Sequence, residues 1–237
     1  MTGSPLVLAH RGASAAAPEN TLAAFALARD LGADGVELDV RRTADDVLVV
    51  HHDAVVEGFG LIVEHPFAEL RVALPAVPTL AEALEECRGL LVNVEVKCCA
   101  WDPDPDPPGR PVLRGAVAAI RAAAADVVVS SFDLDAVDAC RELAPELVTA
   151  WLTSGQAPAA AAAIAAPRGH RWIHPDWGSV LAAPAEEVEA AHAVGCLVDV
   201  WTVNDPDAMR ELVRRGVDGL ITDLPDLALA TVRPSGD

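Results

Sequence analysis

The sequence contains one lysine and no tyrosine, although 17 of its 237 residues are basic. The other basic residues are all arginines, so Lys97 stands apart from every other side-chain cation in the chain. Positive charge is also scarce overall, because 36 acidic residues bring the formal net charge to −19 at pH 7. An acidic surface repels phosphate backbones, which argues against nucleic-acid binding. It remains compatible with a small anionic substrate, because a bound metal ion reverses the local sign of charge.

Long apolar runs are also missing, and we expect no secretory leader segment. No stretch approaches the roughly 18 consecutive apolar residues of a membrane-spanning helix. The first candidate strand, residues 6–9, begins too close to Met1 for a standard secretory signal. We therefore expect a cytoplasmic protein with no membrane span.

The five cysteines form neither a disulfide framework nor a zinc signature, because their number is odd and no CxxC pair occurs. We expect all of them to be small buried side chains in a reducing compartment. They are Cys87, Cys98, Cys99, Cys140 and Cys196.

Short apolar runs alternate with helix-length segments along the chain. The candidate strands cover residues 6–9, 35–40, 90–96, 127–130, 147–151, 171–174, 197–201 and 219–222. Eight strands that are each followed by a helix predict a (β/α)₈ TIM barrel, with residues 1–237 as one domain. A doubly wound open sheet is the alternative. In the first helical segment Ala24, Leu27, Ala28 and Leu31 share one face, and Asn20 is the expected N-cap.

Three segments depart from this alternation. A small insertion, about residues 45–75, follows the second strand and is expected to hold a hairpin and a short turn. The acidic, proline-rich residues 101–111 follow the third strand, so a barrel places them on the catalytic face. We expect a solvated loop there, and a loop that borders the site is the alternative. Residues 231–237 have no pattern and are expected to form a frayed tail.

Two strands carry charge where a barrel interior is normally apolar. Side chains alternate between the faces of a strand, so Glu37 and Asp39 share one face, and Glu95 and Lys97 share another. The valines between them pack on the outer helices, which turns the carboxylates inward. Three inward carboxylates are costly unless a cation compensates them. A hard divalent ion suits carboxylate oxygens, and purely structural ion pairs to Arg41, Arg42 or Lys97 are the alternative.

Histidines occur at two of the expected strand ends. His10 and Arg11 close the first strand, and His51 and His52 close a β-like run. Adjacent residues point to opposite faces, so we expect one of the latter pair to face the site. A divalent ion, Arg11 and Lys97 against three carboxylates leave about one positive charge, which suits a singly charged phosphodiester.

These residues lie in an ordered series of motifs that resembles the glycerophosphodiester phosphodiesterases. AHRGASAAAPENTLAAF is similar to the family's opening HRG…PENT…AF signature, and GADGVELDVRRTADDVLVVHHD is similar to its E-x-D…HD stretch. VPTLAEAL, LVNVEVK, VSSFD, VWTVND and GVDGLITDLPD resemble the later motifs in the same order. The resemblance covers residues 6–227 and also implies a barrel with an insertion after the second strand.

The resemblance implies a role for each motif residue. It implies that one divalent ion, Mg²⁺ or Ca²⁺ with Mn²⁺ as a further option, is bound by Glu37, Asp39 and Glu95. It implies that His10 and His52 are catalytic and that Arg11 and Lys97 bind phosphate. It also implies that Trp201 and Phe132 line the substrate pocket and that Glu19, Asn20 and Asp223 brace the site.

The implied function is metal-dependent hydrolysis of glycerophosphodiesters, small anionic substrates of lipid and glycerol metabolism, to sn-glycerol 3-phosphate and an alcohol. One segment departs from the family, because DAVVEGFG lacks its Arg-Thr-Thr run and keeps only Gly58 and Gly60. A different phosphodiester, such as a lysophospholipid, therefore stays open as the substrate. A catalytically silent binding module is disfavoured, because every charged motif position is present. The sequence carries no signal for an oligomeric state.

Overall fold

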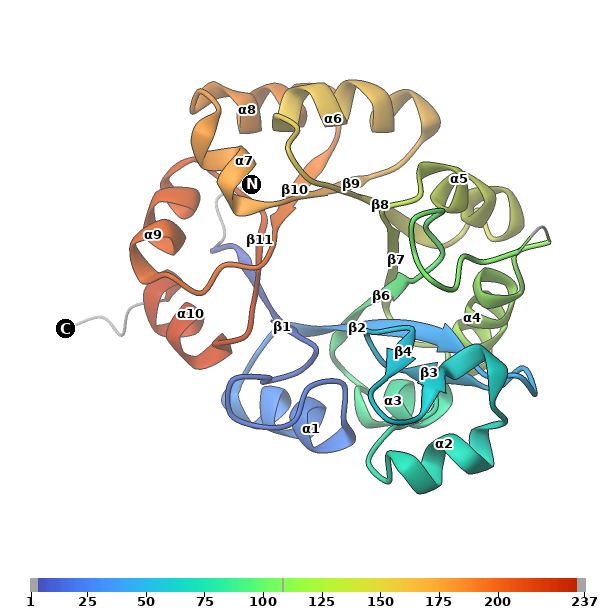
Figure 1. Cartoon of the computed structure of the whole chain (residues 1–237). Coiled ribbons are helices and arrows are strands. Elements are labelled where there is room, and N and C mark those ends of the chain that lie inside the picture. The colour runs from blue at the N-terminus through green and yellow to red at the C-terminus, as the bar shows by residue number, and fades with distance from the viewer. Residues whose placement is uncertain (1–3, 108, 234–237) are drawn as a thin grey trace.

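Eight parallel strands close into a barrel within residues 4–107 and 109–233, the part of the chain that the computed structural model describes. Strands that are neighbours in the barrel follow one another along the chain, and β1 pairs with both β2 and β11, which closes the sheet (Figure 1). The barrel strands are β1 (Leu6–His10), β2 (Gly35–Arg42), β6 (Leu91–Val96), β7 (Val127–Ser131), β8 (Val148–Thr153), β9 (Trp172–Pro175), β10 (Leu197–Val200) and β11 (Gly219–Thr222). The predicted TIM barrel is confirmed, and the open-sheet alternative is wrong.

Helices surround the barrel and cover the outer faces of its strands (Figure 1). They are α1 (Leu22–Leu31), α3 (Leu80–Glu86), α4 (Pro111–Ala123), α5 (Leu134–Leu143), α6 (Pro158–Ala165), the 3₁₀ turn η2 (Ala166–Arg168), α7 (Trp177–Ala182), α8 (Glu186–Ala193), α9 (Pro206–Arg214) and α10 (Pro225–Val232). Among the described helices, none has the length and apolar character that a membrane crossing requires.

Two helix ends differ from the sequence-based expectation. Thr21 caps α1, accepting a hydrogen bond from the backbone N–H of Ala24, whereas the side chain of Asn20 is bonded elsewhere. At the other end of the chain, α10 extends through Thr231 and Val232, and Val232 is buried. The predicted tail therefore starts too early, and its residues 234–237 lie outside the described part of the chain.

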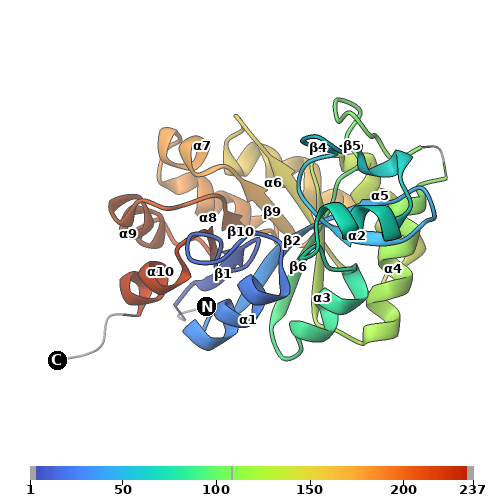
Figure 2. The same ribbon diagram turned by 60° about the horizontal axis from the view of Figure 1, so that its bottom comes forward.

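The small insertion after β2 is confirmed as part of the fold. Its strand β3 (Leu48–Val50) pairs antiparallel with β2, and its hairpin consists of β4 (Val55–Val56) and β5 (Gly60–Leu61). The turn η1 (Ile62–Glu64) and helix α2 (Phe67–Ala73) complete it (Figure 2). Gly58 and Gly60 of the hairpin have positive φ values of 73° and 111°, a conformation that glycine adopts without the steric penalty of a Cβ atom.

The interior of the barrel changes from apolar to polar along its axis. Buried Val128, Ala150 and Trp172 pack with half-buried Leu6 and Leu91 at the amino-terminal ends of the strands. The outward valines and leucines of β2 and β6 belong instead to the core beneath the helices. All five cysteines are buried and free, as expected.

Strand register brings the charged residues together at the other end. His10 on β1 pairs in register with Glu37 on β2, and Asp39 on β2 pairs with Glu95 on β6. Because alternate residues of a strand share a face, the inward charges of three neighbouring strands meet there.

The spacing between β2 and β6 depends on a glycine, which gives a first prediction. A Cβ at Gly35 would lie 2.3 Å from the carbonyl oxygen of Leu91. We expect Gly35→Ala to lower the free energy of unfolding by about 2 kcal/mol, the scale of overpacking. Gly58→Ala, which meets no neighbouring atom but has a φ of +73°, is expected to cost about 1 kcal/mol. Urea unfolding measures the free energy of unfolding of both variants. Equal losses would show that the close approach of β2 and β6 adds nothing to the cost of a side chain at position 35.

Candidate active site

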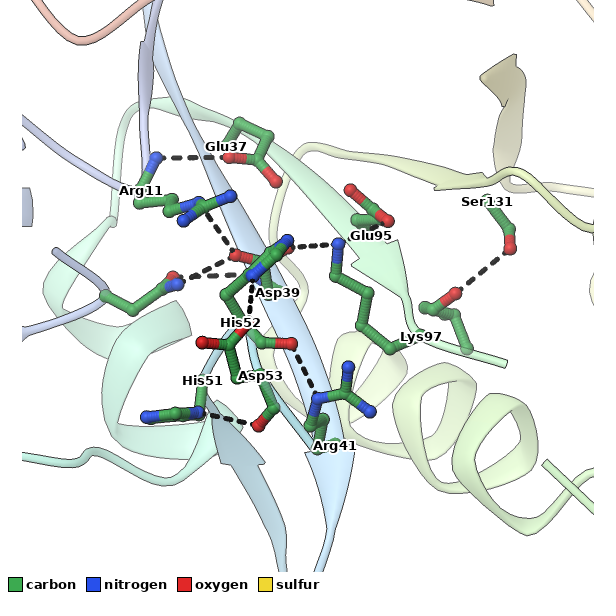
Figure 3. Close-up of polar contacts among 12 residues, drawn as sticks. Arg11, Glu37, Asp39, Arg41, His51, His52, Asp53, Glu95, Lys97 and Ser131 are labelled. Atoms are coloured by element: carbon green, nitrogen blue, oxygen red, sulfur yellow. Dashed lines mark hydrogen bonds and ion pairs between the residues drawn. The ribbon is translucent and has the colours of Figure 1, made fainter. Parts of the chain in front are cut away.

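Three buried carboxylates form the centre of the site. Glu37 and Asp39 come from β2 and Glu95 from β6, and each offers an oxygen within 4.8 Å of the others (Figure 3). Their exposed fractions are 3%, 1% and 8%. Water therefore does little to screen the repulsion among them.

Two cations compensate this cluster incompletely. The Nζ atom of Lys97 lies 2.8 Å from Asp39 Oδ1 and 2.6 Å from Glu95 Oε1, and Figure 3 shows it between the two carboxylates. The Nε atom of Arg11 lies 3.3 Å from Asp39 Oδ2. Three carboxylates against two cations leave one negative charge in a buried place.

The carboxyl pKa values follow from this imbalance. Burial, together with the charge of Asp39, raises the pKa of Glu37 to about 8. Burial also raises the pKa of Glu95, although Lys97 opposes it. Burial acts in the same direction on Asp39, but Lys97 and Arg11 outweigh it and hold the pKa of that carboxyl below its usual range.

The cluster fits a hard divalent cation. Glu37 Oε1 is buried and has no hydrogen-bond partner among the described residues, so one donor oxygen is free for a ligand. The donors are all carboxylate oxygens, which Mg²⁺, Ca²⁺ and Mn²⁺ prefer. The alternative of structural ion pairs is confirmed for Lys97, which contacts Asp39 and Glu95. It is wrong for Arg41 and Arg42, which pair with Asp102 and Asp46.

A carboxylate holds the imidazole of His10. Its Nδ1 lies 2.6 Å from Asp223 Oδ1, and Asp223 also accepts hydrogen bonds from Ser14 and Asn204. Burial raises the pKa of Asp223, but its bonds with His10 and Asn204 outweigh that effect and lower the value to about 2. Burial lowers the pKa of His10, and Asp223 and Glu37 more than restore it, so the net shift is upward.

The second imidazole is held in the same way. His52 Nδ1 lies 2.7 Å from Asp53 Oδ1, next to it in the chain. With Nδ1 bonded to a carboxylate, Nε2 is the nitrogen that remains available in both rings. His51 turns its Nδ1 to the backbone oxygen of Asp53, 2.9 Å away, and does not line the pocket that His10 and His52 share.

Side chains from the loop after β1 brace this arrangement. Glu19 accepts hydrogen bonds of 3.0 and 3.1 Å from Arg11, and Asn20 donates one of 2.8 Å to Asp39. Arg11 and Asn20 both have positive φ, 57° and 55°, which is uncommon for residues other than glycine. The backbone is therefore held in a less favourable conformation at the point where both side chains reach the carboxylates.

The charged residues open into a small cavity of about 100 Å³, which we call the inner pocket. Two aromatic rings form part of its wall, Phe132 and Trp201, with centroids 5.4 Å apart and planes at 86°. The indole N–H of Trp201 donates to the backbone oxygen of His174, which fixes the orientation of the ring. The inner pocket is lined by His10, Arg11, Glu37, His52, Asn93, Glu95, Lys97, Phe132, Leu152, Trp201, Thr202 and Ile221.

Every site residue that the sequence indicated lies at or beside the inner pocket, but four participants were missed. Asp53 orients His52, and the Asp of the HD motif was the available signal. Trp101, Asp102 and Arg41 lie beside the site, where Arg41 bonds to Asp102 and to the backbone oxygen of His52. No local pattern in the sequence connects residue 41 with residue 102.

A family profile and a related protein both match the sequence of this chain over most of its length. Residues 10–227 match the profile of the Glycerophosphoryl diester phosphodiesterase family. A glycerophosphodiester phosphodiesterase of Caldanaerobacter subterraneus subsp. tengcongensis is 32% identical over 264 residues, which cover 98% of this chain and 99% of that protein.

Solved structures give the same result. An Oleispira antarctica phosphodiesterase, in complex with the product sn-glycerol-3-phosphate, matches with a TM-score of 0.84 at 27% identity over 97% of each chain. A glycerophosphodiester phosphodiesterase of Thermotoga maritima matches with a TM-score of 0.77 at 29% identity, over 96% of this chain and 98% of that one. The resemblance seen in the motifs is confirmed along almost the whole chain, and the protein belongs to the glycerophosphoryl diester phosphodiesterase family.

Proposed function

We propose that this chain hydrolyses glycerophosphodiesters to sn-glycerol 3-phosphate and an alcohol, in a metal-dependent reaction that uses two histidines for proton transfer. The observation that carries the proposal is one pocket lined by Glu37, Glu95 and two carboxylate-bound imidazoles, with Asp39 in the same carboxylate cluster. The sn-glycerol-3-phosphate bound to the Oleispira protein supports the same product.

Arg11 and Lys97 bind the phosphodiester through its non-bridging oxygens. Both line the inner pocket, and both are already oriented by carboxylates, so little side-chain entropy is lost when substrate binds. The glycerol unit lies against Phe132 and Trp201. Glu37, Asp39 and Glu95 hold the divalent cation, which when bound supplies Lewis-acid neutralisation of charge on the phosphoryl oxygens.

His10 and His52 move the protons. One Nε2 accepts the proton of the attacking hydroxyl as its oxygen forms a bond to phosphorus. The other Nε2 donates a proton to the departing alkoxide as the second phosphorus–oxygen bond breaks. Asp223 and Asp53 stabilise each imidazolium in turn. The same geometry serves either of two nucleophiles, water or a hydroxyl of the glycerol unit. Attack by the glycerol hydroxyl forms a cyclic phosphate, which water then opens.

The direct test is release of sn-glycerol 3-phosphate from glycerophosphocholine and glycerophosphoethanolamine. We expect release with added Mg²⁺ or Ca²⁺, and its loss with EDTA, because removal of the cation leaves three carboxylates beside an anionic substrate. Calorimetric titration of the same cations supplies a readout independent of turnover. Cation binding without release from either substrate would contradict the proposed reaction, and cleavage of lysophosphatidylcholine in that case would favour the lysophospholipid reading.

Replacement of either imidazole tests the proton transfers. His10→Ala and His52→Ala are each expected to lower kcat by at least about a hundredfold, the usual scale for losing a general acid or base. His51→Ala is the matched control, since it removes a neighbouring imidazole that does not line the inner pocket. A mild effect at position 10 or 52, with the fold intact, would remove that residue from the mechanism.

The single lysine gives a separate prediction. Lys97→Arg keeps the charge but replaces a compact ammonium, held by two carboxylates, with a wider planar group. We expect normal folding and a loss of kcat/KM of at least about tenfold, the scale of one misplaced charged hydrogen bond. Lys97→Met, which removes the charge, should lose more. Near wild-type turnover of Lys97→Arg would contradict a phosphate-binding role that depends on the ammonium.

A further inference from the structure

A second cavity of about 460 Å³ adjoins the inner pocket, and we call it the outer cleft. His52, Glu95, Lys97 and Phe132 line both spaces, so the two cavities adjoin at Lys97, one of the two proposed phosphate-binding residues. A phosphodiester held there places one ester arm in each cavity. The inner pocket, about 100 Å³, has room for the constant glycerol unit, which leaves the larger outer cleft for the variable alcohol.

One wall of the outer cleft is aromatic. Trp101, on the loop after β6, is 74% exposed and lies edge to face with Phe132, with centroids 6.3 Å apart and planes at 70°. Ala54 and Val55 of the insertion line the same cleft. An exposed indole beside a second ring offers a π-face to a group bound in the cleft.

The position of Trp101 is fixed by the residue that follows it. Asp102 receives two hydrogen bonds from Arg41, of 3.0 and 2.8 Å, and Arg41 is 4% exposed. The Nε of Arg41 also donates to the backbone oxygen of His52, 2.7 Å away. The loop and the catalytic histidine are therefore held to the same buried guanidinium.

The charge around the outer cleft favours a cation. Its two lining cations, Arg41 and Lys97, are both bonded to carboxylates. Asp53 adds a carboxylate that is 72% exposed and pairs with an imidazole. Asp104 and Asp106 continue the acidic loop beyond Trp101, and the nearby Arg42 and Arg110 pair with Asp46 and Asp133.

We propose that the outer cleft binds the alcohol half of the substrate and selects alcohols that carry a methylated ammonium group, such as choline. Trp101 and Phe132 provide the aromatic faces for a cation–π contact, and the acidic loop supplies the complementary field. The apolar lining accommodates the methyl groups, which donate no hydrogen bonds. This assignment rests on the proposed function, since it concerns the second half of the same substrate.

The test compares two substrates that share the glycerol phosphate unit, glycerophosphocholine and the neutral-headed glycerophosphoglycerol. We expect the ratio of their kcat/KM values to favour the choline ester, and Trp101→Ala to lower that ratio about threefold, the scale of a cation–π contact at an exposed site. Trp101→Phe keeps an aromatic face and should keep most of the ratio. Val72→Ala, which removes exposed apolar surface on α2, is the control and should leave it unchanged.

Inhibition separates charge from shape. Free choline should inhibit glycerophosphoglycerol hydrolysis more strongly than its neutral isostere 3,3-dimethylbutan-1-ol, and Trp101→Ala should remove this difference. Equal inhibition by the two alcohols, or an equal loss on both substrates in Trp101→Ala, would overturn the assignment while the proposed function stands. A folded wild-type protein that cleaves neither substrate would overturn both.

Discussion

The active site depends on three carboxylates that are buried at one end of a closed barrel. Burying carboxylates costs free energy, and this cost is tolerated only where cations, hydrogen bonds or a metal ion offset it. Arg11 and Lys97 offset two of the charges, and Glu37 Oε1 is left with no partner among the described residues. The positive-φ loop after β1 supplies further support, because it brings both Arg11 and Asn20 to Asp39. Fold and chemistry are connected at this point, since the register that closes the barrel also forces the carboxylates together.

The use of a single lysine follows from the space between those carboxylates. Lys97 extends from the end of β6 and places one nitrogen within 2.8 Å of Asp39 and 2.6 Å of Glu95. A guanidinium presents its donors in a fixed plane, which suits the bidentate contact of Arg41 with Asp102 but not two carboxylates approaching one point. The chain therefore uses both kinds of cation a short distance apart, each where its geometry fits the acceptors.

The sequence predicts the barrel and most of the charged centre, because both depend on local periodicity. Period-two alternation identified the inward faces of β2 and β6, and it predicted that only one of His51 and His52 faces the site. The resemblance to the family's HD motif selected His52. The predicted N-cap of α1 was wrong, because the residue expected there has a second possible partner. Asn20 is a favoured N-cap residue, but its amide is used by Asp39, and Thr21 caps the helix instead. The pairing of Arg41 with Asp102 escaped prediction, because it joins segments 61 residues apart and leaves no periodic trace.

The segment after the HD motif, where the chain departs from the family's pattern, and the loop after β6 line the same outer cleft. The segment after the HD motif lacks the Arg-Thr-Thr run and supplies instead Ala54 and Val55 to the outer cleft. The loop after β6 adds an indole and several carboxylates opposite them. The absence of cationic and hydroxyl groups on one side of the cleft, together with the acidic and aromatic groups of the loop after β6, is the physical basis of the proposed preference for cationic alcohols. The three carboxylates lie on β2 and β6 and His10 lies on β1, while His52 follows β3 of the insertion, shortly before Ala54 and Val55, so every residue of the reacting centre is retained beside this departure. Loop chemistry on a fixed barrel can in this way alter which ester is cleaved without altering how it is cleaved.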